Sequence, residues 1–582
     1  MDSSSDDEKW EVPTFARHRK PPPGTESIGY DLYESPQYMN HLKQFGRLSG
    51  MDVCNNIGFR WILLGMVGLV TGLVAVAVDV SIDYLFEFRM HINDVVVDAG
   101  WSIGCQYLAF VGVALCSVSV AAYLVCYVEV LAAGSGIPEI KCFLNGIDFP
   151  NVVGLKTLCA KAIGIVFSVT AGLPCGKEGP MIHSGAITGA LVTRCDILHT
   201  INPVVIQQET RDFVAAGAAA GVAAAFGAPL GGVLFAVEEG ASHMDPSIMT
   251  RLFVACATGA LASRFFIGPI LGGIPWGHLG SAVPVSFGKF HHMEWDILEM
   301  PIFAMMGVAG GLFGALFNAV NQRLSEWRIR HIGPRGRRRF FEVLLVTLVV
   351  SSLQFLVPAV SVASKEFSLS EEGVGSLPSQ LHLRSLSESE ESQLPLRRHL
   401  KLEELSLSES LFWQKNTAAL KSLFHSEEEF NLWYVLLFFV MNLSLSCLTY
   451  GIGVPSGLFV PALLTGAAFG RIVGQLLHSY VFPISEGQLF AATGLYSLIG
   501  ASAMLAGTAR ITISLAMILM EVTGNAEFGL PIFLVVMLAK WTGDVFNRGI
   551  YDLHIIDLKK VPLLEAKPET NMIGIFGFVY VV

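Results

Sequence analysis

Apolar residues occupy long runs along most of this chain, whereas polar residues gather in the two tails and in two stretches between the runs. The runs lie at residues 57–86, 104–132, 153–172, 178–195, 211–238 and 248–268, and then at 298–324, 340–363, 432–450, 455–479, 487–507, 509–524 and 529–548. A helix that crosses a bilayer needs about 20 apolar residues, and several runs are shorter or are broken by glycine and proline. The pattern predicts an all-helical membrane protein with several crossings between residues 53 and 562, in which some helices are tilted or broken.

The composition agrees with a membrane protein. Of the 582 residues, 52% are hydrophobic and 15% are charged, whereas soluble domains carry about 25% charged residues. The ten cysteines form no CxxC or CxxxC pair, so the sequence predicts neither a zinc site nor a disulfide framework. No HExxH, P-loop or Ser-His-Asp spacing stands out, and we therefore expect neither an enzyme nor a bound metal or cofactor.

Glycine and proline breaks occur in both halves of the chain, which are approximately residues 55–268 and 298–550. The segment GKEGP, Gly176–Pro180, interrupts the first half, and GLFVP, Gly457–Pro461, interrupts the second. Paired breaks of this kind are typical of transporters built from inverted repeats, in which half-helices meet near the middle of the bilayer. The breaks therefore indicate discontinuous helices that meet near the middle of the bilayer.

The distribution of charge predicts the orientation in the membrane. Residues 1–52 are polar and include a basic cluster, which indicates a cytosolic and mostly disordered tail. The segment from Arg323 to Arg339 is rich in arginine, and short basic loops stay in the cytosol. Residues 364–431 come one apolar run later and are rich in serine, leucine and glutamate. We expect them to form a solvated, partly disordered loop on the opposite side.

Three glycine-containing breaks that end in proline indicate an anion pathway: Gly134–Pro138, Gly176–Pro180 and Gly457–Pro461. Helices that begin at such breaks present free N–H groups and the positive end of their dipole, which can hold an anion. Glu178 lies in the second break, although a charged side chain in the bilayer costs at least about 2.5 kcal/mol unless it faces water, protein or an ion. A carboxylate there would compete with an anion for the same position.

In this order the three breaks resemble those of the CLC family of chloride channels and chloride/proton exchangers. The resemblance extends from about Phe59 to Pro562 and includes the stretches AAGSGIPEIKCFLNG, GKEGPMIHSG, GVAAAFGAPLGGVLFAVEEGAS, YGIGVPSGLFVPALLTGAAFGR and KWTGDVFNRGIYDLH. These stretches are most similar to those of the late-endosomal and lysosomal exchangers of eukaryotes. The resemblance implies the CLC fold, with two inverted halves, and a homodimer in which each subunit has its own anion pathway.

The resemblance also implies roles for single residues in the anion pathway. Glu178 matches the gating glutamate, whose carboxylate occupies an anion site when ionised and leaves it when protonated. Ser135, Tyr551 and the backbone amides of Leu458 and Phe459 match the groups that bind the central chloride ion, and a serine at position 135 favours chloride over nitrate. From the residues alone, Ser135 could also cap a helix, and Tyr551 could lie at the membrane interface.

Glu239 matches the internal proton glutamate of the exchangers, which relays protons from the cytosol toward Glu178 by a route separate from that of the anion. Taken alone, Glu238 and Glu239 could also form a solvated helix end. With the resemblance, Glu238 is expected to be the structural member of the pair. In its apolar surroundings Glu239 is the residue on which an exchanger would depend.

Three further polar side chains lie in or beside the apolar runs. His183 comes five residues after Glu178 and so points well round the helix from it, which favours packing or a hydrogen bond over a proton relay. Lys161 and Arg510 are either buried structural charges or part of the electric field of the pathway. The sequence does not decide between these two roles.

The sequence therefore favours a chloride/proton antiporter. A passive chloride channel on the same fold is one alternative, although channels of the family carry an uncharged residue where this chain has Glu239. A truncated membrane protein that does not transport is the other, because residues 563–582 form a short tail where eukaryotic relatives continue into a nucleotide-binding pair of CBS domains. The resemblance implies a late-endosomal, lysosomal or other acidic organelle membrane, with the plasma membrane as the alternative, and identifies no accessory subunit.

Overall fold

The computed structural model describes residues 50–147, 151–194, 203–240, 247–271, 275–277, 295–333, 335–372, 407–426, 429–481 and 492–561. The chain divides into two units, Met1–Asn56 and Ile57–Val582, and apart from the first residues of one helix the described residues belong to the second unit. The predicted N-terminal and C-terminal tails and the middle of the predicted loop 364–431 lie outside the described residues.

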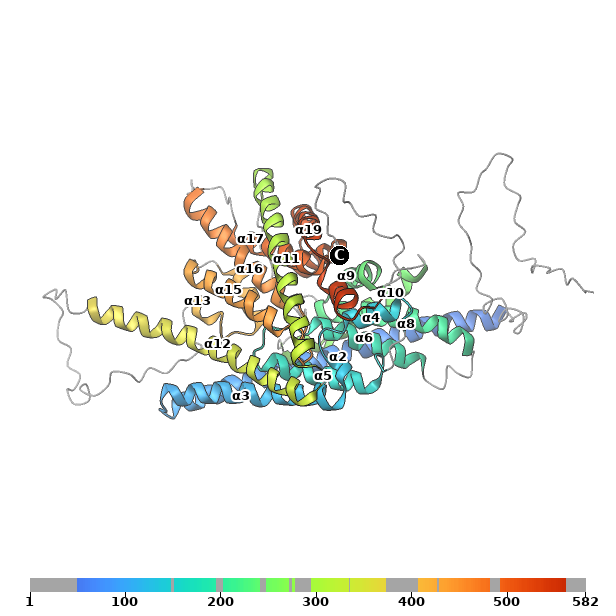
Figure 1. Ribbon diagram of the computed structural model, residues 1–582. Coiled ribbons are helices and arrows are strands. Elements are labelled where there is room, and N and C mark those ends of the chain that lie inside the picture. Colours follow the sequence, from blue (N-terminus) through green and yellow to red (C-terminus); the bar gives the residue numbers. More distant parts are fainter. Residues whose placement is uncertain are drawn as a thin grey trace, which may run out of the picture. The chain divides into compact units, whose positions relative to one another are not determined.

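The described residues form helices and two isolated β-bridges, which confirms the all-helical prediction (Figure 1). The first half contains α2 (Gly50–Asp98), α3 (Ile103–Tyr123), η1 (Leu124–Val128), η2 (Val130–Ala132), α4 (Ile137–Leu144), α5 (Leu155–Thr170), α6 (Glu178–Thr193), α8 (Pro203–Phe226), α9 (Pro229–Phe235), η3 (Ala236–Gly240) and α10 (Ser247–Leu271). The second half contains η4 (Ile297–Glu299), α11 (Met300–His331), α12 (Gly336–Glu372), α13 (Leu407–Ser410), α14 (Asn416–His425), α15 (Leu432–Thr449), α16 (Phe459–Leu476), η6 (Leu477–Val481), α17 (Thr493–Ala509), α18 (Ile513–Thr523), η7 (Ala526–Phe528), α19 (Gly529–Asp544), α20 (Ile550–Asp552) and η8 (Leu553–Leu558).

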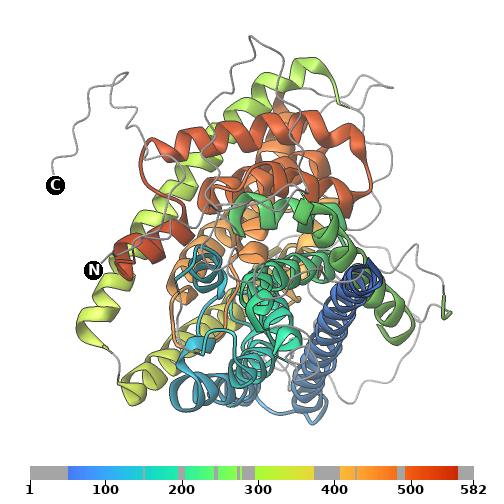
Figure 2. The same cartoon turned by 90° about the vertical axis from the view of Figure 1, so that its right-hand side faces the viewer.

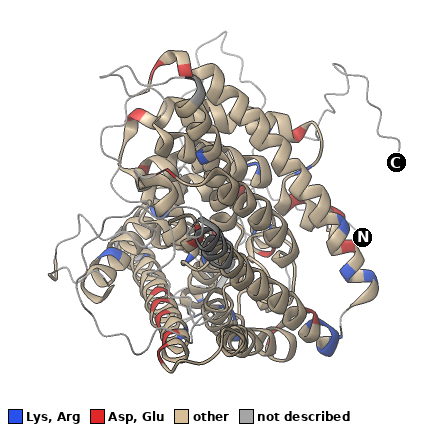
Figure 3. Ribbon diagram, turned by 90° about the vertical axis from the view of Figure 1, so that its left-hand side faces the viewer, with Lys and Arg blue, Asp and Glu red and all other residues tan. Residues whose placement is uncertain are grey.

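The lengths and compositions of the helices fit a bilayer. Within the described part of the chain, eight helices are long and apolar enough to cross a membrane. Charged residues are sparse along the helices, as Figure 3 shows. Other helices, such as α6, α9 and α18, are shorter than a full crossing, as expected for helices that begin within the membrane.

The same helix pairing occurs in both halves. Helix α6, which begins within GKEGP, packs along α8, and helix α16, which begins within GLFVP, packs along α17. Both pairs approach closely through glycine: a Cβ atom on Gly185 would overlap the backbone of Gly217, and one on Gly466 would overlap that of Gly500. Small residues allow this close packing where no hydrophobic effect drives helices together. Figure 2 shows the first half, blue to green, beside the second, yellow to red.

Two short helices from different halves cap each other. The carboxylate of Glu238, just after α9, accepts hydrogen bonds from the backbone N–H groups of Thr512 at 2.6 Å and Ser514 at 2.8 Å, at the start of α18. The carboxylate of Glu521, in α18, accepts hydrogen bonds from the N–H groups of Leu230 at 3.1 Å and Gly231 at 2.8 Å, at the start of α9. Each carboxylate satisfies donors that have no partner within their own helix. Glu238 therefore has the structural role predicted for it.

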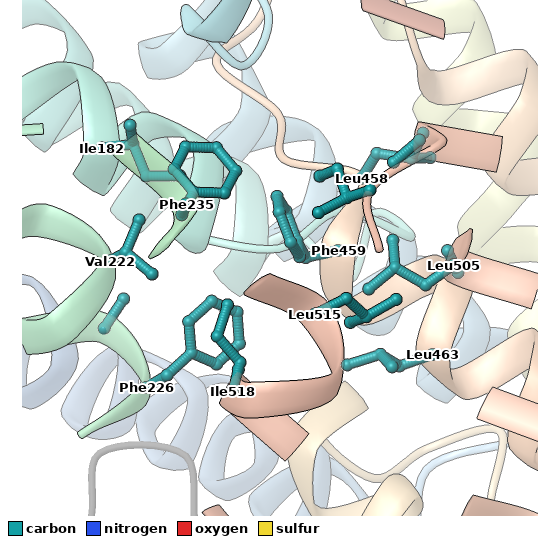
Figure 4. Close-up of a cluster of buried hydrophobic side chains, with 14 of the residues drawn as sticks. Ile182, Val222, Phe226, Phe235, Leu458, Phe459, Leu463, Leu505, Leu515 and Ile518 are labelled. Carbon is teal, nitrogen blue, oxygen red and sulfur yellow. The ribbon is translucent and has the colours of Figure 1, made fainter. Parts of the chain in front are cut away.

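Apolar side chains from both halves fill the space between these helices. Phe459, at the start of α16, lies with its ring centre 5.7 Å from that of Phe226 and 6.2 Å from that of Phe235. Figure 4 shows these rings in a cluster with Ile182, Val222, Leu458, Leu463, Leu505, Leu515 and Ile518. The start of α16 is therefore fixed against the first half by direct packing.

The prediction of a solvated loop over 364–431 was wrong for the parts that the structure describes. Helix α12 continues to Glu372, and α13 and α14 form within residues 407–426. The indole of Trp413 is buried and stacks on Phe110 and Phe355 at 5.4 and 5.7 Å, and its N–H donates to the carbonyl oxygen of Gln354 at 3.0 Å. The apolar clusters of this stretch, such as Leu411–Trp413, drive it into the core although the segment as a whole is polar.

Candidate functional site

The three glycine-containing breaks meet in the structure. Gly134 donates its N–H to Val454 at 3.0 Å, and its carbonyl oxygen accepts from Ser456 at 3.2 Å. Gly176 and Gly457 exchange two backbone hydrogen bonds of 2.9 and 2.8 Å, which form one of the isolated β-bridges. These bonds bring the first turns of α4, α6 and α16 to one place, as the sequence predicted for an anion site made of helix N-termini.

Glycine is required at two points of this junction. A Cβ atom on Gly179 would lie 2.8 Å from the Cβ atom of Ser135 and 3.4 Å from the Cα atom of Gly457. Gly136 has a φ of 84°, in the left-handed region that favours glycine. These two positions require glycine because the loops are in direct contact there. The side chain that lies at the contact with Gly179 is that of Ser135.

Glu178 is the first residue of α6 and is buried, with 1% of its surface exposed. Neither of its carboxylate oxygens has a hydrogen-bond partner by distance and angle among the described residues, although the backbone N–H groups of Glu178 itself and of Val460 lie nearby. A buried carboxylate without a firm partner is costly, and native structures keep few such groups. The geometry marks Glu178 as a group with a function.

A cavity of about 160 Å³, here called the Glu178 vestibule, opens beside this carboxylate. Its lining includes two lysine–aspartate ion pairs, Lys177 with Asp79 and Lys415 with Asp83. The segment before α14 covers part of it, and Asn416 donates a hydrogen bond to the carbonyl oxygen of Cys175 at 3.2 Å. The part of the predicted loop that folds is thus a wall of the cavity in front of Glu178.

A second cavity of about 250 Å³, here called the Ser135 vestibule, lies on the other side of the junction. Its lining is rich in cationic and hydroxyl groups and includes Ser135, Glu139, Arg328, Arg339, Tyr450, His554 and Lys559. Two of these arginines belong to the basic segment that the sequence assigns to the cytosol. Helix α12 starts at this vestibule and carries the chain away from it, toward the segment that walls the Glu178 vestibule.

Ser135 lines the Ser135 vestibule, whereas Tyr551 is not part of that lining. The Ser135 hydroxyl oxygen lies 3.4 Å from the N–H of Ile137, a long contact, and the residue that caps α4 is Gly136. Tyr551 is buried, which excludes the alternative of an interfacial tyrosine, and its hydroxyl has no partner among the described residues. Tyr450, which the sequence analysis did not single out, lines the same vestibule as Ser135 and interacts electrostatically with Tyr551.

The backbone of Leu458 and Phe459 forms the start of α16. Both residues are buried, and Leu458 is the residue that precedes the first turn. The first N–H groups of a helix have no acceptor within that helix, so these amides remain available as donors. They lie beside Gly457, whose bonds to Gly176 connect them to the Glu178 segment.

Glu239 is not a solvated helix end. Its Oε1 atom accepts a hydrogen bond of 3.0 Å from the ammonium of Lys141, which also binds Asp552 at 2.7 Å. The sequence analysis missed Lys141 and Asp552, because Lys141 is 98 residues from Glu239 and 411 residues from Asp552 along the chain. A positive charge in the short helix after the first break was the available signal.

The other polar candidates are paired. His183 and Lys161 are fully buried, with 2.7 Å between the His183 Nδ1 and Lys161 Nζ atoms, and His183 Nε2 lies 3.0 Å from the carbonyl oxygen of Val152. This agrees with a hydrogen-bonded, packed His183. Arg510 follows the last residue of α17, and it binds the side-chain oxygen of Asn547 at 2.8 Å and Asp544 at 3.5 Å.

Comparison with known proteins places these features in one family. The chain matches the model of the voltage-gated chloride channels over residues 114–544. It is 37% identical over 554 residues to the H(+)/Cl(-) exchange transporter 7 of Homo sapiens, covering 93% of this chain and 65% of that protein. It is 31% identical over 591 residues to the chloride channel protein CLC-d of Arabidopsis thaliana, covering 98% of this chain and 70% of that protein.

Solved structures show the same fold. A eukaryotic CLC transporter has a TM-score of 0.62 and 24% identity, with 85% of this chain and 73% of that chain covered. A slow cyanobacterial Cl⁻/H⁺ antiporter has a TM-score of 0.64 and 20% identity, with 85% and 96% covered. The CLC fold expected from the sequence is confirmed. The chain spans 65% of the length of the human transporter that it matches.

Proposed function

This chain belongs to the voltage-gated chloride channel family, and from that membership we propose that it exchanges chloride for protons across a membrane. The observation that carries the proposal is the buried Glu178 carboxylate, which has no firm hydrogen-bond partner where three helix N-termini meet. Such a carboxylate and an anion need the same donors. Occupation by one therefore excludes the other, which is the physical requirement for coupling a proton to an anion.

The anion follows the two vestibules in this proposal. Chloride from the Ser135 vestibule is bound by the hydroxyls of Ser135 and Tyr551 and by the backbone amides of Leu458 and Phe459. Helix N-termini attract the ion without the full positive charge that would trap it. When Glu178 takes up a proton, its carboxyl group leaves the junction and the ion continues into the Glu178 vestibule. The cationic residues of the Ser135 vestibule support its assignment to the cytosolic side.

The proton follows a separate branch through Glu239. This side chain lies on η3 beside Lys141, whereas the anion route passes the Ser135 hydroxyl. The Tyr551 phenol is near enough to both Glu178 and Glu239 to interact with each electrostatically. In this proposal Glu239 gives its proton toward Glu178 on a branch that meets the anion route at Tyr551.

A passive channel on the same fold is the alternative function, and flux through purified protein separates the two. When a chloride gradient is imposed on liposomes that contain the protein, we expect it to drive protons against their own gradient. The pH inside the liposomes should therefore change. Paired chloride and pH electrodes measure both ions in one sample. Chloride flux without any proton movement would make the protein a channel, and no flux of either ion would favour a non-transporting protein.

The assembly and location are proposed from the family resemblance. We infer a homodimer with one pathway in each subunit, in the membrane of a late endosome, lysosome or other acidic organelle. An apolar face, which includes the exposed Leu230, Met249 and Phe253 and the half-buried Met517, is available for a second copy or for lipid. The protein mass of the purified particle, from light scattering with the detergent subtracted, should be twice that of one chain.

A further inference from the structure

A lysine joins Glu239 to an aspartate at the surface. The Lys141 ammonium on α4 lies 3.0 Å from Glu239 and 2.7 Å from Asp552 on α20. The exposed fraction of the side chain falls from 37% at Asp552 to 19% at Lys141 and 11% at Glu239. Helix α4 contacts η3, α20 and η8, so three elements hold the cluster together. The cluster therefore runs from the surface toward the interior.

The cluster has one negative charge more than its ammonium neutralises. The other groups that face Glu239 are the carboxylate of Glu238, which is occupied by the start of α18, and the phenol of Tyr551. Uptake of one proton by Glu239 would make the three side chains neutral together. It would also remove the negative charge of Glu239 that attracts the Lys141 ammonium, whereas the shorter bond between Lys141 and Asp552 would remain.

We propose that Lys141 is a positioning residue that competes with the proton for Glu239, and that Asp552 retains Lys141 while Glu239 is protonated. The inference rests on the proposed exchange function. Released from the ion pair, the neutral Glu239 carboxyl can turn into a cavity of about 10 Å³ that borders it, lined by Ile140, Ile182 and Phe235 among others. A space of this size is at the lower limit for holding one water molecule. Lys141 thus sets the cytosolic pH at which Glu239 is loaded.

Two substitutions should shift this pH in opposite directions. Lys141→Met removes the competing charge and keeps the length of the side chain, so the cytosolic pH for half-maximal proton transport should rise by about 1 unit. Asp552→Asn leaves Glu239 as the only carboxylate partner of Lys141 in this cluster and removes a nearby negative charge, so the same pH should fall by about 1 unit. Lys141→Arg keeps the charge and should stay close to the wild type.

The measurement is chloride-driven proton transport in liposomes with the cytosolic-side pH varied. Asp557→Asn is the matched control, because it breaks the exposed Arg548–Asp557 pair of the same region without touching Glu239, and it should cause no shift. Equal shifts in one direction, or no shift with normal chloride flux, would overturn the role of Lys141. A wild type that moves chloride but no protons would instead overturn the exchange function and this inference with it. If Lys141→Met does not fold, the other two variants still test the proposal: the pH should fall in Asp552→Asn and stay close to the wild type in Lys141→Arg.

Discussion

Replacing Glu238 by alanine should destabilise the protein and leave its proton coupling intact. The carboxylate accepts hydrogen bonds from the N–H groups of Thr512 and Ser514, from the Ser514 hydroxyl at 2.7 Å and from the Thr512 hydroxyl. Alanine removes both carboxylate oxygens and with them all four hydrogen bonds. The two hydroxyls can turn to other acceptors, whereas the two N–H groups at the start of α18 cannot move without unwinding the helix.

The size of the loss follows from the capping role. Removal of an N-cap side chain costs about 0.5–2 kcal/mol, and the loss of a negative charge near a helix N-terminus adds about 0.3–1 kcal/mol. Glu238 is exposed on one side, so water can replace part of what is lost. We therefore expect the free energy of unfolding to fall by about 1–3 kcal/mol. Glu239→Ala leaves Lys141 paired with the more exposed Asp552, so no charge is left unpaired, and it should cost about 1 kcal/mol or less.

The assay compares both variants in two measurements. Thermal melting of detergent-purified protein, recorded by tryptophan fluorescence at one scan rate, reports the stability, and the liposome assay reports proton transport. Glu238→Ala should melt at a lower temperature with unchanged coupling, and Glu239→Ala should melt nearly as the wild type while losing proton transport. Glu521→Ala, which removes the equivalent cap of α9, is the control for Glu238→Ala. Loss of proton transport with wild-type melting in Glu238→Ala would refute the assignment of the two acids.

Two further variants test the anion pathway. Glu178→Gln imitates the protonated acid, so chloride flux should persist while proton coupling disappears; chloride-driven proton pumping by this variant would contradict its role as the gate. Ser135→Pro removes a hydroxyl donor worth about 1.5–3 kcal/mol to a charged partner. The ratio of nitrate to chloride flux should therefore rise severalfold, and an unchanged ratio would show that Ser135 does not bind the anion.

The sequence was sufficient for the elements whose cause is local. Long apolar runs predicted the helices, and the three glycine breaks predicted helix starts because glycine permits the tight contacts of Gly136 and Gly179. The predicted boundary between the apolar runs 487–507 and 509–524 lies within two residues of the end of α17. That helix ends at Ala509, and the next residue, Arg510, has a φ of 66°. The expected link of Ser135, Glu178 and the α16 start depended on the resemblance, since no local pattern brings three distant loops together.

The features that the sequence left out depend on distant partners or on short clusters within polar surroundings. Nothing near Glu239 in sequence reveals that Lys141 and Asp552 share a site with it. The sequence analysis did not predict the wall formed by Leu411 to Asn416, because serine and glutamate dominate the whole segment. The burial of this wall depends on a few apolar side chains, such as Trp413, which stacks on Phe110 and Phe355. Long-range pairing and local exceptions to composition are what a linear pattern cannot contain.

The backbone bonds between the glycine breaks limit how this protein can move. Gly134 with Val454 and Ser456, and Gly176 with Gly457, connect the two halves by four peptide hydrogen bonds at the centre of the molecule. Rocking one half against the other would break these bonds in the interior, where water cannot take the place of the lost partner. Each buried group left without a partner would cost about 1–3 kcal/mol. Rotation of one carboxylate side chain breaks none of them. In the proposed exchange, the least costly cycle therefore keeps the scaffold rigid and confines alternation to motions the size of a side chain.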